Sequence, residues 1–371
     1  MKILMHCVYY PPEVGGLESH VHYLCRALVE KGHRLDVVTS HSISDTPRTE
    51  VMDGVHVHRT WFPGKSTAGW VAHAAGSIPR CLTAARDADI LHAQAFQSIP
   101  PMVVARIRTG APLVSTWHTS HFLRLARRPA WSALLGRLVA AGDANLAASE
   151  EIAHVAESLA PGHTVHAVTN GVETSIFKRT EPSLHAPEQG RRRLVVPRRL
   201  FEKNGVEFAV RALPSITLQH DVEVFLIGDG PERDRLEALA GELGVLDRIH
   251  FLGARAHAEM PGLLSSAELA IFPSLMEATS VAALECMACE IPVAASRVGG
   301  LPEIVDERVG GLFAPADPGS LAKVVSDLLS DPDLSARGAA GRERVVADWS
   351  NERLAQYHLE LYEELISQRV A

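Results

Sequence analysis

Two glutamates that stand eight positions apart, Glu277 and Glu285, are the residues whose type and spacing most clearly indicate chemistry. The first follows a short apolar run at 269–272, and the second lies in a helical pattern that Thr279 or Ser280 opens. The first turn of a helix has unpaired backbone N–H groups and the positive end of the helix dipole, and both attract anions. The stretch therefore predicts a pocket for an anionic ligand, with carboxylates that accept hydrogen bonds from ligand hydroxyl groups.

Three cations, Arg198, Arg199 and Lys203, follow another predicted strand. Since one arginine can bind two oxygens at once, two or three cations at a strand end suit a diphosphate. A solvated run of surface charge is the alternative. The position directly after a strand favours the diphosphate interpretation.

Glycines and one histidine also follow predicted strands. Gly15 and Gly16 come between a strand and a helix, where the missing Cβ atoms let a ligand approach backbone N–H groups. A plain tight turn is the alternative. The Gly-Asp-Gly sequence at 228–230 indicates a similar turn beside a nucleotide. His118 stands at the carboxyl end of a strand, so either a structural role or a role facing the ligand is open to it.

Two further pairs of reactive residues are weaker candidates. Asp87 and Asp89 form a D-x-D sequence, but it straddles a helix end and a buried strand, so we predict no metal site there. Cys286 and Cys289 both lie in the helix that contains Glu285, where inward packing explains them. The odd total of five scattered cysteines argues against a disulfide framework.

Composition limits the class of protein. A chain of 371 residues with 46% hydrophobic and 22% charged residues indicates a globular protein of two domains. Its net charge of −8 argues against nucleic acid as a partner. No apolar run approaches the roughly 18 residues that a membrane span needs, and the first apolar run ends at Pro11 and Pro12. We therefore predict a cytoplasmic protein.

One basic and apolar stretch, Phe122–Val139, suggests contact with an anionic membrane surface. Such contact would place the protein at the inner face of the membrane. The alternative is a helix that faces the core with solvated arginines, and Pro129 interrupts any long helix there.

Short apolar runs alternate with helical patterns along the whole chain, which predicts parallel sheets covered on both faces. The pattern breaks in the polar stretch 178–193, which we interpret as a linker. We expect an N-terminal domain at 1–178, a C-terminal domain at 190–350, and a last helix at 351–371 that packs back on the first domain. In such folds ligands bind outside the carboxyl ends of the strands, here in a cleft between the domains.

Taken together, these motifs resemble the retaining glycosyltransferases of the GT4 type, which have the two-domain, Rossmann-like GT-B fold. The resemblance covers nearly the whole chain. It rests on the sequences GGLESHVHYLCRALVEKGHRLDVVT, NGVETSIF, RRLFEKNGVEFAVRAL, IGDGPERDRLEALA and PSLMEATSVAALECMACEIPVAASRVGGLPEIV. The last is the most specific, since it contains Glu277 and Glu285.

The resemblance implies a nucleotide-diphosphate sugar as donor, no resident metal or cofactor, and a sugar, lipid-linked or small-molecule acceptor. It also implies a role for each candidate residue. The catalytic residues would be His118, Arg199, Lys203 and Glu277. The donor-binding residues would be Gly15, Gly16, Arg199, Lys203, Glu277, Thr279, Ser280, Val281 and Glu285, with Glu285 on the ribose and the backbone of Ser280 and Val281 on a phosphate.

The chain departs from the family pattern at three places. Ala278-Thr279-Ser280 follows Glu277 where Gly-Phe-Gly is common, Glu290 stands where glycine is usual, and Asn204 competes with Lys203 for the position of the lysine. Two other functions stay open, a sugar-nucleotide epimerase of the same architecture and a non-catalytic subunit that binds nucleotide sugars.

Overall fold

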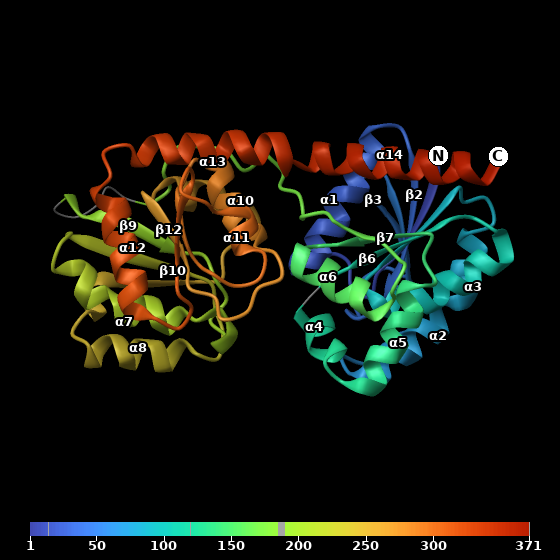
Figure 1. Cartoon of the computed structure of the whole chain (residues 1–371), viewed down its shortest axis with the longest axis horizontal. Helices are drawn as coiled ribbons and strands as arrows, with labels where there is room; N and C mark the ends of the chain where they lie inside the picture. Colours follow the sequence, from blue (N-terminus) through green and yellow to red (C-terminus); the bar gives the residue numbers. More distant parts are fainter. Residues whose placement is uncertain (14, 119, 185–189, 371) are drawn as a thin grey trace. The chain divides into compact units, whose positions relative to one another are not determined.

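The computed structural model describes residues 1–13, 15–118, 120–184 and 190–370. They form two α/β units (Figure 1). The first comprises Met1–Gly171 together with the chain from Asn351 onward, and the second comprises Val172–Ser350. Each contains a mainly parallel sheet with helices against it, so the predicted fold class is confirmed.

The first unit has eight strands in the order β3-β4-β2-β1-β5-β6-β7-β8. They are β1 (Lys2–His6), β2 (Arg34–Ser40), β3 (Thr49–Met52), β4 (Val55–Thr60), β5 (Ile90–Gln94), β6 (Leu113–Trp117), β7 (Ala144–Ala147) and β8 (Val165–Ala167). Its helices are α1 (Gly16–Glu30), α2 (Thr67–Ala84), α3 (Ile99–Thr109), α4 (Ser120–Ala126), α5 (Pro129–Val139), α6 (Glu150–Leu159) and α14 (Asn351–Val370). Strand β3, which pairs antiparallel with β4 at the sheet edge, is an addition to the predicted strands.

The second unit has six strands in the order β11-β10-β9-β12-β13-β14, and every pair is parallel. They are β9 (Arg192–Val196), β10 (Val222–Ile227), β11 (Ile249–Gly253), β12 (Leu269–Phe272), β13 (Val293–Ser296) and β14 (Gly310–Phe313). Its helices are α7 (Val206–Thr217), α8 (Arg233–Glu242), α9 (Met260–Ser265), α10 (Val281–Ala288), α11 (Leu301–Ile304), α12 (Pro318–Ser330) and α13 (Leu334–Asp348).

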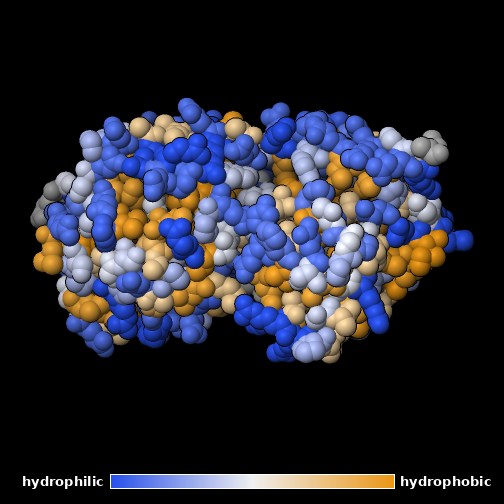
Figure 2. Space-filling view, viewed as in Figure 1, coloured by the Kyte–Doolittle hydropathy of each residue, from blue (hydrophilic) through white to orange (hydrophobic). Residues whose placement is uncertain are grey.

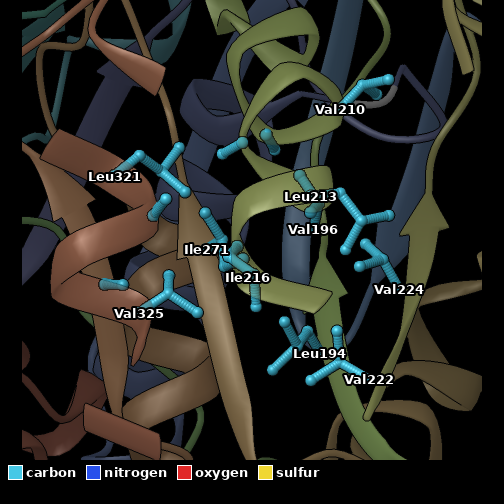
Figure 3. Packing of buried hydrophobic residues seen from close by; sticks show 14 of the residues in the cluster. Leu194, Val196, Val210, Leu213, Ile216, Val222, Val224, Ile271, Leu321 and Val325 are labelled. Atoms are coloured by element: carbon cyan, nitrogen blue, oxygen red, sulfur yellow. The ribbon is translucent and has the colours of Figure 1, made fainter. Parts of the chain in front are cut away.

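The core of the second unit explains why the apolar runs become strands. Figure 3 shows side chains of the central strands, such as Val196 and Ile271, packed against side chains of α7 and α12, such as Leu213 and Leu321. A second buried cluster includes Phe272 from the same strands together with α10 residues. Strands that are buried on both faces need apolar residues at nearly every position.

The polar stretch expected as a linker is held by the second unit. The chain passes from the first unit to the second after Gly171 and returns after Ser350. The backbone N–H of Thr180 donates to Ser265 Oγ at 3.1 Å, and that of Leu184 donates to Ser266 Oγ at 3.1 Å. Residues 185–189 lie outside the described residues.

Helix α14 belongs to the first unit, although it is the last element of the chain. Its residues Leu354, Leu359 and Tyr362 are buried in a core cluster with residues of β1 and α1. This helix thus completes a core whose other members come from the first 170 residues or so.

Among the described residues, none of the helices is both long enough and apolar enough to cross a membrane. Figure 2 shows a largely hydrophilic face with smaller hydrophobic areas between the polar side chains.

We expect Leu354→Ala to lower the free energy of unfolding of the first unit by about 2–5 kcal/mol, because it opens a cavity under α14. Leu354 is 4% exposed. Urea denaturation followed by tryptophan fluorescence measures this, since Trp61, Trp70, Trp117 and Trp131 all lie in that unit. The control is Ile107→Ala on α3, which removes a side chain that is 81% exposed. An equal effect of both substitutions would contradict the role of α14 in the core.

Candidate functional site

The second unit places its candidate residues at a switch in strand order. Strand β9 pairs with β10 on one side and β12 on the other, so the chain connections leave β9 and β12 in opposite directions. Ligands of open α/β sheets bind outside the carboxyl ends of strands at such a point. Arg198 follows β9 and Glu277 follows β12, so the two flank this position.

Arg198 is the centre of a polar cluster at this point. Its Nη2 contacts Glu277 Oε2 and donates to Asn204 Oδ1 at 3.0 Å. Its Nη1 donates to Ser280 Oγ at 3.4 Å, and its guanidinium lies 5.7 Å from the centre of the Phe272 ring. The side chains of Arg198 and Glu277 are 11% and 14% exposed, so the two charges are largely shielded from water.

The two cations to which the sequence assigned the diphosphate lie beside this cluster. Arg199 is exposed, and its guanidinium lies over the Phe201 ring at 5.6 Å. Lys203 is also exposed, and its backbone oxygen accepts from the N–H of Leu275 at 2.9 Å. The roles of Arg199 and Lys203 toward the diphosphate stay predictions.

Asn204, which competes with Lys203 for the position of the family lysine, lies within the polar cluster. It is buried, and its Nδ2 donates to the backbone oxygen of Arg199 at 2.6 Å while its Oδ1 accepts from Arg198. The inward position in the short 3₁₀ turn Glu202–Asn204 thus belongs to Asn204, and Lys203 points to the surface.

Neighbouring backbone fixes the turn that contains Glu277. Ser296 Oγ donates to the backbone oxygen of Ser274 at 2.6 Å, and the N–H of Gly300 donates to that of Ala278 at 3.2 Å. Gly299 has a φ of +51°, and a Cβ there would lie 1.7 Å from the backbone oxygen of Glu277. Only glycine fits at this approach.

Helix α10 presents its first turn to the same place. Ser280 is its N-cap residue and accepts from the N–H of Ala283 at 3.4 Å. The predicted helix start is therefore confirmed, and the N–H of Val281 belongs to the unpaired first turn. Thr279 is partly buried just before the cap.

Glu285 lies one turn further along α10 and has a partner that the sequence did not indicate. Its Oε1 is 3.0 Å from His257 Nε2, and its side chain is 13% exposed. His257 in turn packs on Phe177 with ring centres 4.8 Å apart.

The Gly-Asp-Gly turn packs against the loop that contains Arg198. A Cβ at Gly228 would lie 2.3 Å from the backbone oxygen of Arg198, and one at Gly230 would lie 2.3 Å from that of Leu200. The N–H of Leu200 donates to the backbone oxygen of Asp229 at 3.0 Å. These glycines therefore serve a close approach between two strand ends.

The departure at Glu290 has a visible backbone consequence. Glu290 follows α10 with a φ of +62°, in the left-handed region where L-residues with side chains are uncommon. This conformation is the physical reason why glycine suits the position.

In the first unit, Gly15 and Gly16 open helix α1. Gly15 is the N-cap with extended backbone, and a Cβ there would lie 2.2 Å from Glu18 Oε2. A Cβ at Gly16 would meet nothing within 4 Å. Val14 lies outside the described residues.

His118 follows β6 and is 3% exposed. Its Nε2 is 2.8 Å from Gln94 Oε1, and its ring packs edge-on against His20 with centres 5.1 Å apart. Burial, together with nearby His358, lowers the pKa of His118 from its ordinary 6.5 to about 3. His118 is therefore a neutral imidazole at pH 7, able to exchange hydrogen bonds but not to act as a cation.

The remaining sequence candidates have local partners. Lys2 Nζ contacts Asp87, and the Lys2 backbone N–H donates to Asp89 Oδ2 at 2.7 Å. Cys286 and Cys289 are buried free thiols. The stretch Phe122–Val139 spans α4 and α5.

The apolar side of that stretch faces inward. Phe122 packs on Trp117 with ring centres 5.1 Å apart. The arginines of the stretch are exposed, and they are Arg124, Arg127, Arg128 and Arg137. Membrane contact by this surface stays a prediction.

Comparison with known proteins places both units in glycosyltransferase families. Residues 14–176 match "Glycosyltransferase Family 4", and residues 178–344 match "Glycosyl transferases group 1". Glycogen synthase of Mycobacterium tuberculosis is 30% identical over 98% of this chain and 94% of that protein. D-inositol 3-phosphate glycosyltransferase of Salinispora arenicola is 28% identical over 96% of this chain and 88% of its own length.

Solved structures share the fold. Sucrose-phosphate synthase from Thermosynechococcus elongatus superposes with a TM-score of 0.87 at 23% identity, covering 99% of both chains. An Anabaena protein in complex with UDP and glucose has a TM-score of 0.79 at 19% identity, covering 98% of this chain and all of its own. These neighbours confirm the GT-B fold.

We expect Gly299→Ala to lower the free energy of unfolding by at least about 1 kcal/mol, because alanine is strained at this φ and meets the backbone of Glu277. Thermal unfolding measures the change. The matched control is Gly241→Ala in α8, where the Cβ meets nothing within 4 Å, and we expect no loss there. Equal stability of the two variants would contradict the close approach at Glu277.

We also expect the first unit to lose stability as the pH falls from 7 to 5. The unfolded chain protonates histidines near pH 6.5, whereas the folded pKa is about 3 for His118 and about 4 for His358. Stability is intact above pH 6.5 and falls below it by about 1.4 kcal/mol per pH unit for each such histidine. Urea denaturation at both pH values measures this, and His118→Gln should reduce the slope. A constant free energy of unfolding would refute the burial of neutral histidines.

Proposed function

Since the chain belongs to the group 1, family 4 glycosyltransferases, we propose that its own Arg198–Glu277 cluster binds the diphosphate and the sugar of the donor. The transfer moves the sugar to an acceptor hydroxyl, with retention at the anomeric carbon and without a resident metal. The single observation that supports the assignment is the ion pair of Arg198 and Glu277 beside the start of α10, at the switch in strand order.

Positive charge at this place suits a diphosphate leaving group. Arg198 supplies a guanidinium, and the first turn of α10 supplies backbone N–H groups of Ser280 and Val281. Such groups stabilise the charge that develops on the leaving oxygen in the transition state, and they are already in position before the reaction. Arg198 and Ser274 both donate hydrogen bonds to Glu277 Oε2 and so fix its carboxylate. Glu277 is placed to accept hydrogen bonds from sugar hydroxyls.

In the proposed reaction, the acceptor oxygen bonds to the anomeric carbon as the bond from that carbon to the diphosphate oxygen breaks. The proton of the acceptor hydroxyl passes to the departing diphosphate. His118 of the first unit, a neutral imidazole, would hydrogen-bond a hydroxyl of the donor sugar. Glu285 would bind the ribose, and His257 would orient its carboxylate.

The relatives support a nucleotide-sugar donor but differ in acceptor. Their names include glycogen synthase and D-inositol 3-phosphate glycosyltransferase, and one structural neighbour was solved with UDP and glucose. We propose a nucleotide-diphosphate sugar as donor and a sugar, lipid-linked or small-molecule acceptor for this chain. Thermal shift with UDP-, GDP-, ADP- and dTDP-sugars identifies the donor, because a ligand at a hundred times its Kd adds about 2.7 kcal/mol of stability.

We expect Arg198→Ala to lower kcat/KM by a hundredfold or more, about 10²–10³, because it removes a preformed donor to the leaving diphosphate. Arg199→Ala and Lys203→Ala should cost less, since both side chains are exposed beside the cluster. Transfer assays in EDTA, with magnesium added back separately, measure all three variants. Near-normal kcat/KM for Arg198→Ala would overturn the assignment.

Two controls separate catalysis from folding and from other activities. Arg198→Lys keeps a positive charge near Glu277, and Arg308→Ala removes an arginine whose side chain is 75% exposed. An assay without acceptor tests the alternatives, because an epimerase would release a changed nucleotide sugar and a non-catalytic subunit would bind the donor without turnover.

A further inference from the structure

We propose that the first unit binds the surface of a membrane that contains anionic lipids, through the exposed side of helix α5 and the arginines that border it. Such binding is separate from the proposed sugar transfer and does not depend on it. The sequence suggested membrane contact for the whole stretch Phe122–Val139, and the exposure of its side chains points to one face of α5.

Helix α5 is apolar on its outer side as well as on its inner side. Its inner side includes Leu135, Gly136 and Val139, which are buried. The exposed positions follow the spacing of one helix face, and they are Ala130, Ala133, Leu134 and Arg137. Leu134 is 44% exposed. Since a surface helix normally turns polar side chains outward, an apolar outer face indicates a partner that covers it.

Arginines border this outer face at both ends. Arg127 and Arg128 precede the helix, and Arg137 lies in its last turn. All three are exposed, as is Arg124 of α4, whose Nη2 lies 2.6 Å from His121 Nδ1. In the described part of the chain, none of these four arginines forms an ion pair. Their positive charge is therefore available to an anion outside the chain.

The charge around α5 has one sign over a long part of the chain. Residues 90–142 contain six arginines and no aspartate or glutamate, although the whole chain has 44 acidic residues. The next acidic residue, Asp143, is paired with Arg106. Because the whole chain has a net charge of −8, attraction to an anionic surface has to come from a local segment such as this one.

The opposite face of the same sheet carries acidic side chains. Val114 and Leu146 belong to the core cluster that includes α14, whereas Trp117, three positions after Val114 in β6, packs on Phe122 of α4. Side chains alternate between the faces of a strand, so α4 and α14 lie on opposite faces (Figure 1). The exposed acidic residues of α14 are Glu352, Glu360, Glu363 and Glu364. An anionic surface thus attracts the side of α4 and α5 and repels the side of α14.

The size and the polarity of the face select a lipid surface over a soluble partner. A soluble polyanion would contact the arginines but leave Leu134 in water, whereas the boundary between lipid headgroups and acyl chains suits both. A protein partner needs about 800 Å² of surface on each side. The 11 residues of α5 span about 16 Å by 10 Å, so this face alone is too small for a protein partner. Guanidinium groups also bind lipid phosphate oxygens in pairs.

The test is sedimentation of the full chain with vesicles of phosphatidylcholine, alone or mixed with an equal part of phosphatidylglycerol. We expect binding to the anionic vesicles at low salt. It should be lost at about 1 M salt, which screens charges beyond about 3 Å.

Two double variants test the arginines. Arg127→Gln with Arg128→Gln should weaken the partition onto anionic vesicles about twentyfold, since each arginine near such a surface contributes about fivefold. The matched control is Lys31→Gln with Arg353→Gln. It removes the same charge from exposed positions after α1 and in α14, and it should change the partition by less than about twofold.

Two further pairs of variants test the apolar face. Leu134→Asp should abolish binding, whereas Leu218→Asp, at a position of the second unit that is 87% exposed, should not. A fluorophore that brightens in apolar surroundings should brighten on anionic vesicles when it is attached in Leu134→Cys, but not in Leu218→Cys. The five native cysteines are buried and do not take the label. Thermal unfolding shows that each variant is folded.

The inference is overturned if the wild type does not bind anionic vesicles, if it binds neutral vesicles equally well, or if the Arg127 and Arg128 double variant binds normally. A fluorophore at position 134 that stays dim on vesicle-bound protein also overturns it. So does light scattering that shows an oligomer without vesicles, if Leu134→Asp converts that oligomer to a monomer, because the face is then a contact between copies. All of these measurements are made without sugars, so their failure leaves the proposed transfer intact.

Discussion

The ion pair of Arg198 and Glu277 is the contact around which the strand ends of the second unit are built. It joins the loop after β9 to the turn after β12, and both partners are largely shielded from water. Desolvation offsets much of the attraction in such a pair, so its contribution to stability is small. Its effect is geometric, because it fixes a guanidinium and a carboxylate at one place. Backbone contacts at Gly228, Gly230 and Gly299 then hold the loops that present them.

The two units differ in the chemistry of their strand ends. The second unit carries charge there, together with the unpaired N–H groups of α10, and such a site favours an anion. The first unit carries a neutral imidazole after β6, since burial lowers the pKa of His118 to about 3. Neutral imidazoles suit hydroxyl groups.

Sequence patterns predicted most of the helices and strands, but they did not predict which contacts single side chains make. Buried parallel strands are continuous apolar runs, and the apolar run at 269–272 has the bounds of β12. Strand β3 was missed because an antiparallel edge strand needs apolar residues on only one face. Sequence offered Thr279 or Ser280 as the start of α10, and the structure has Ser280 as the N-cap residue.

The choice between adjacent arginines could not be made from sequence. Arg198 and Arg199 have the same chemistry, and only the path of the loop turns one inward and the other to the surface. Gln94 and Tyr362 gave no signal, because each is a polar residue within an apolar pattern and their partners are distant in the chain. His257 was missed for the same reason, since 28 positions separate it from Glu285.

The position of α14 has a consequence for how the protein is made. Ribosomes release the chain from its N-terminus at about 5–20 residues per second. The second unit is contiguous in the chain, whereas the first needs Leu354, Leu359 and Tyr362 to close its core. The apolar face that α14 covers is therefore left open until the last helix emerges. During synthesis the first unit therefore folds completely only after the second unit has been made. Until then its exposed apolar face is a surface to which chaperones can bind.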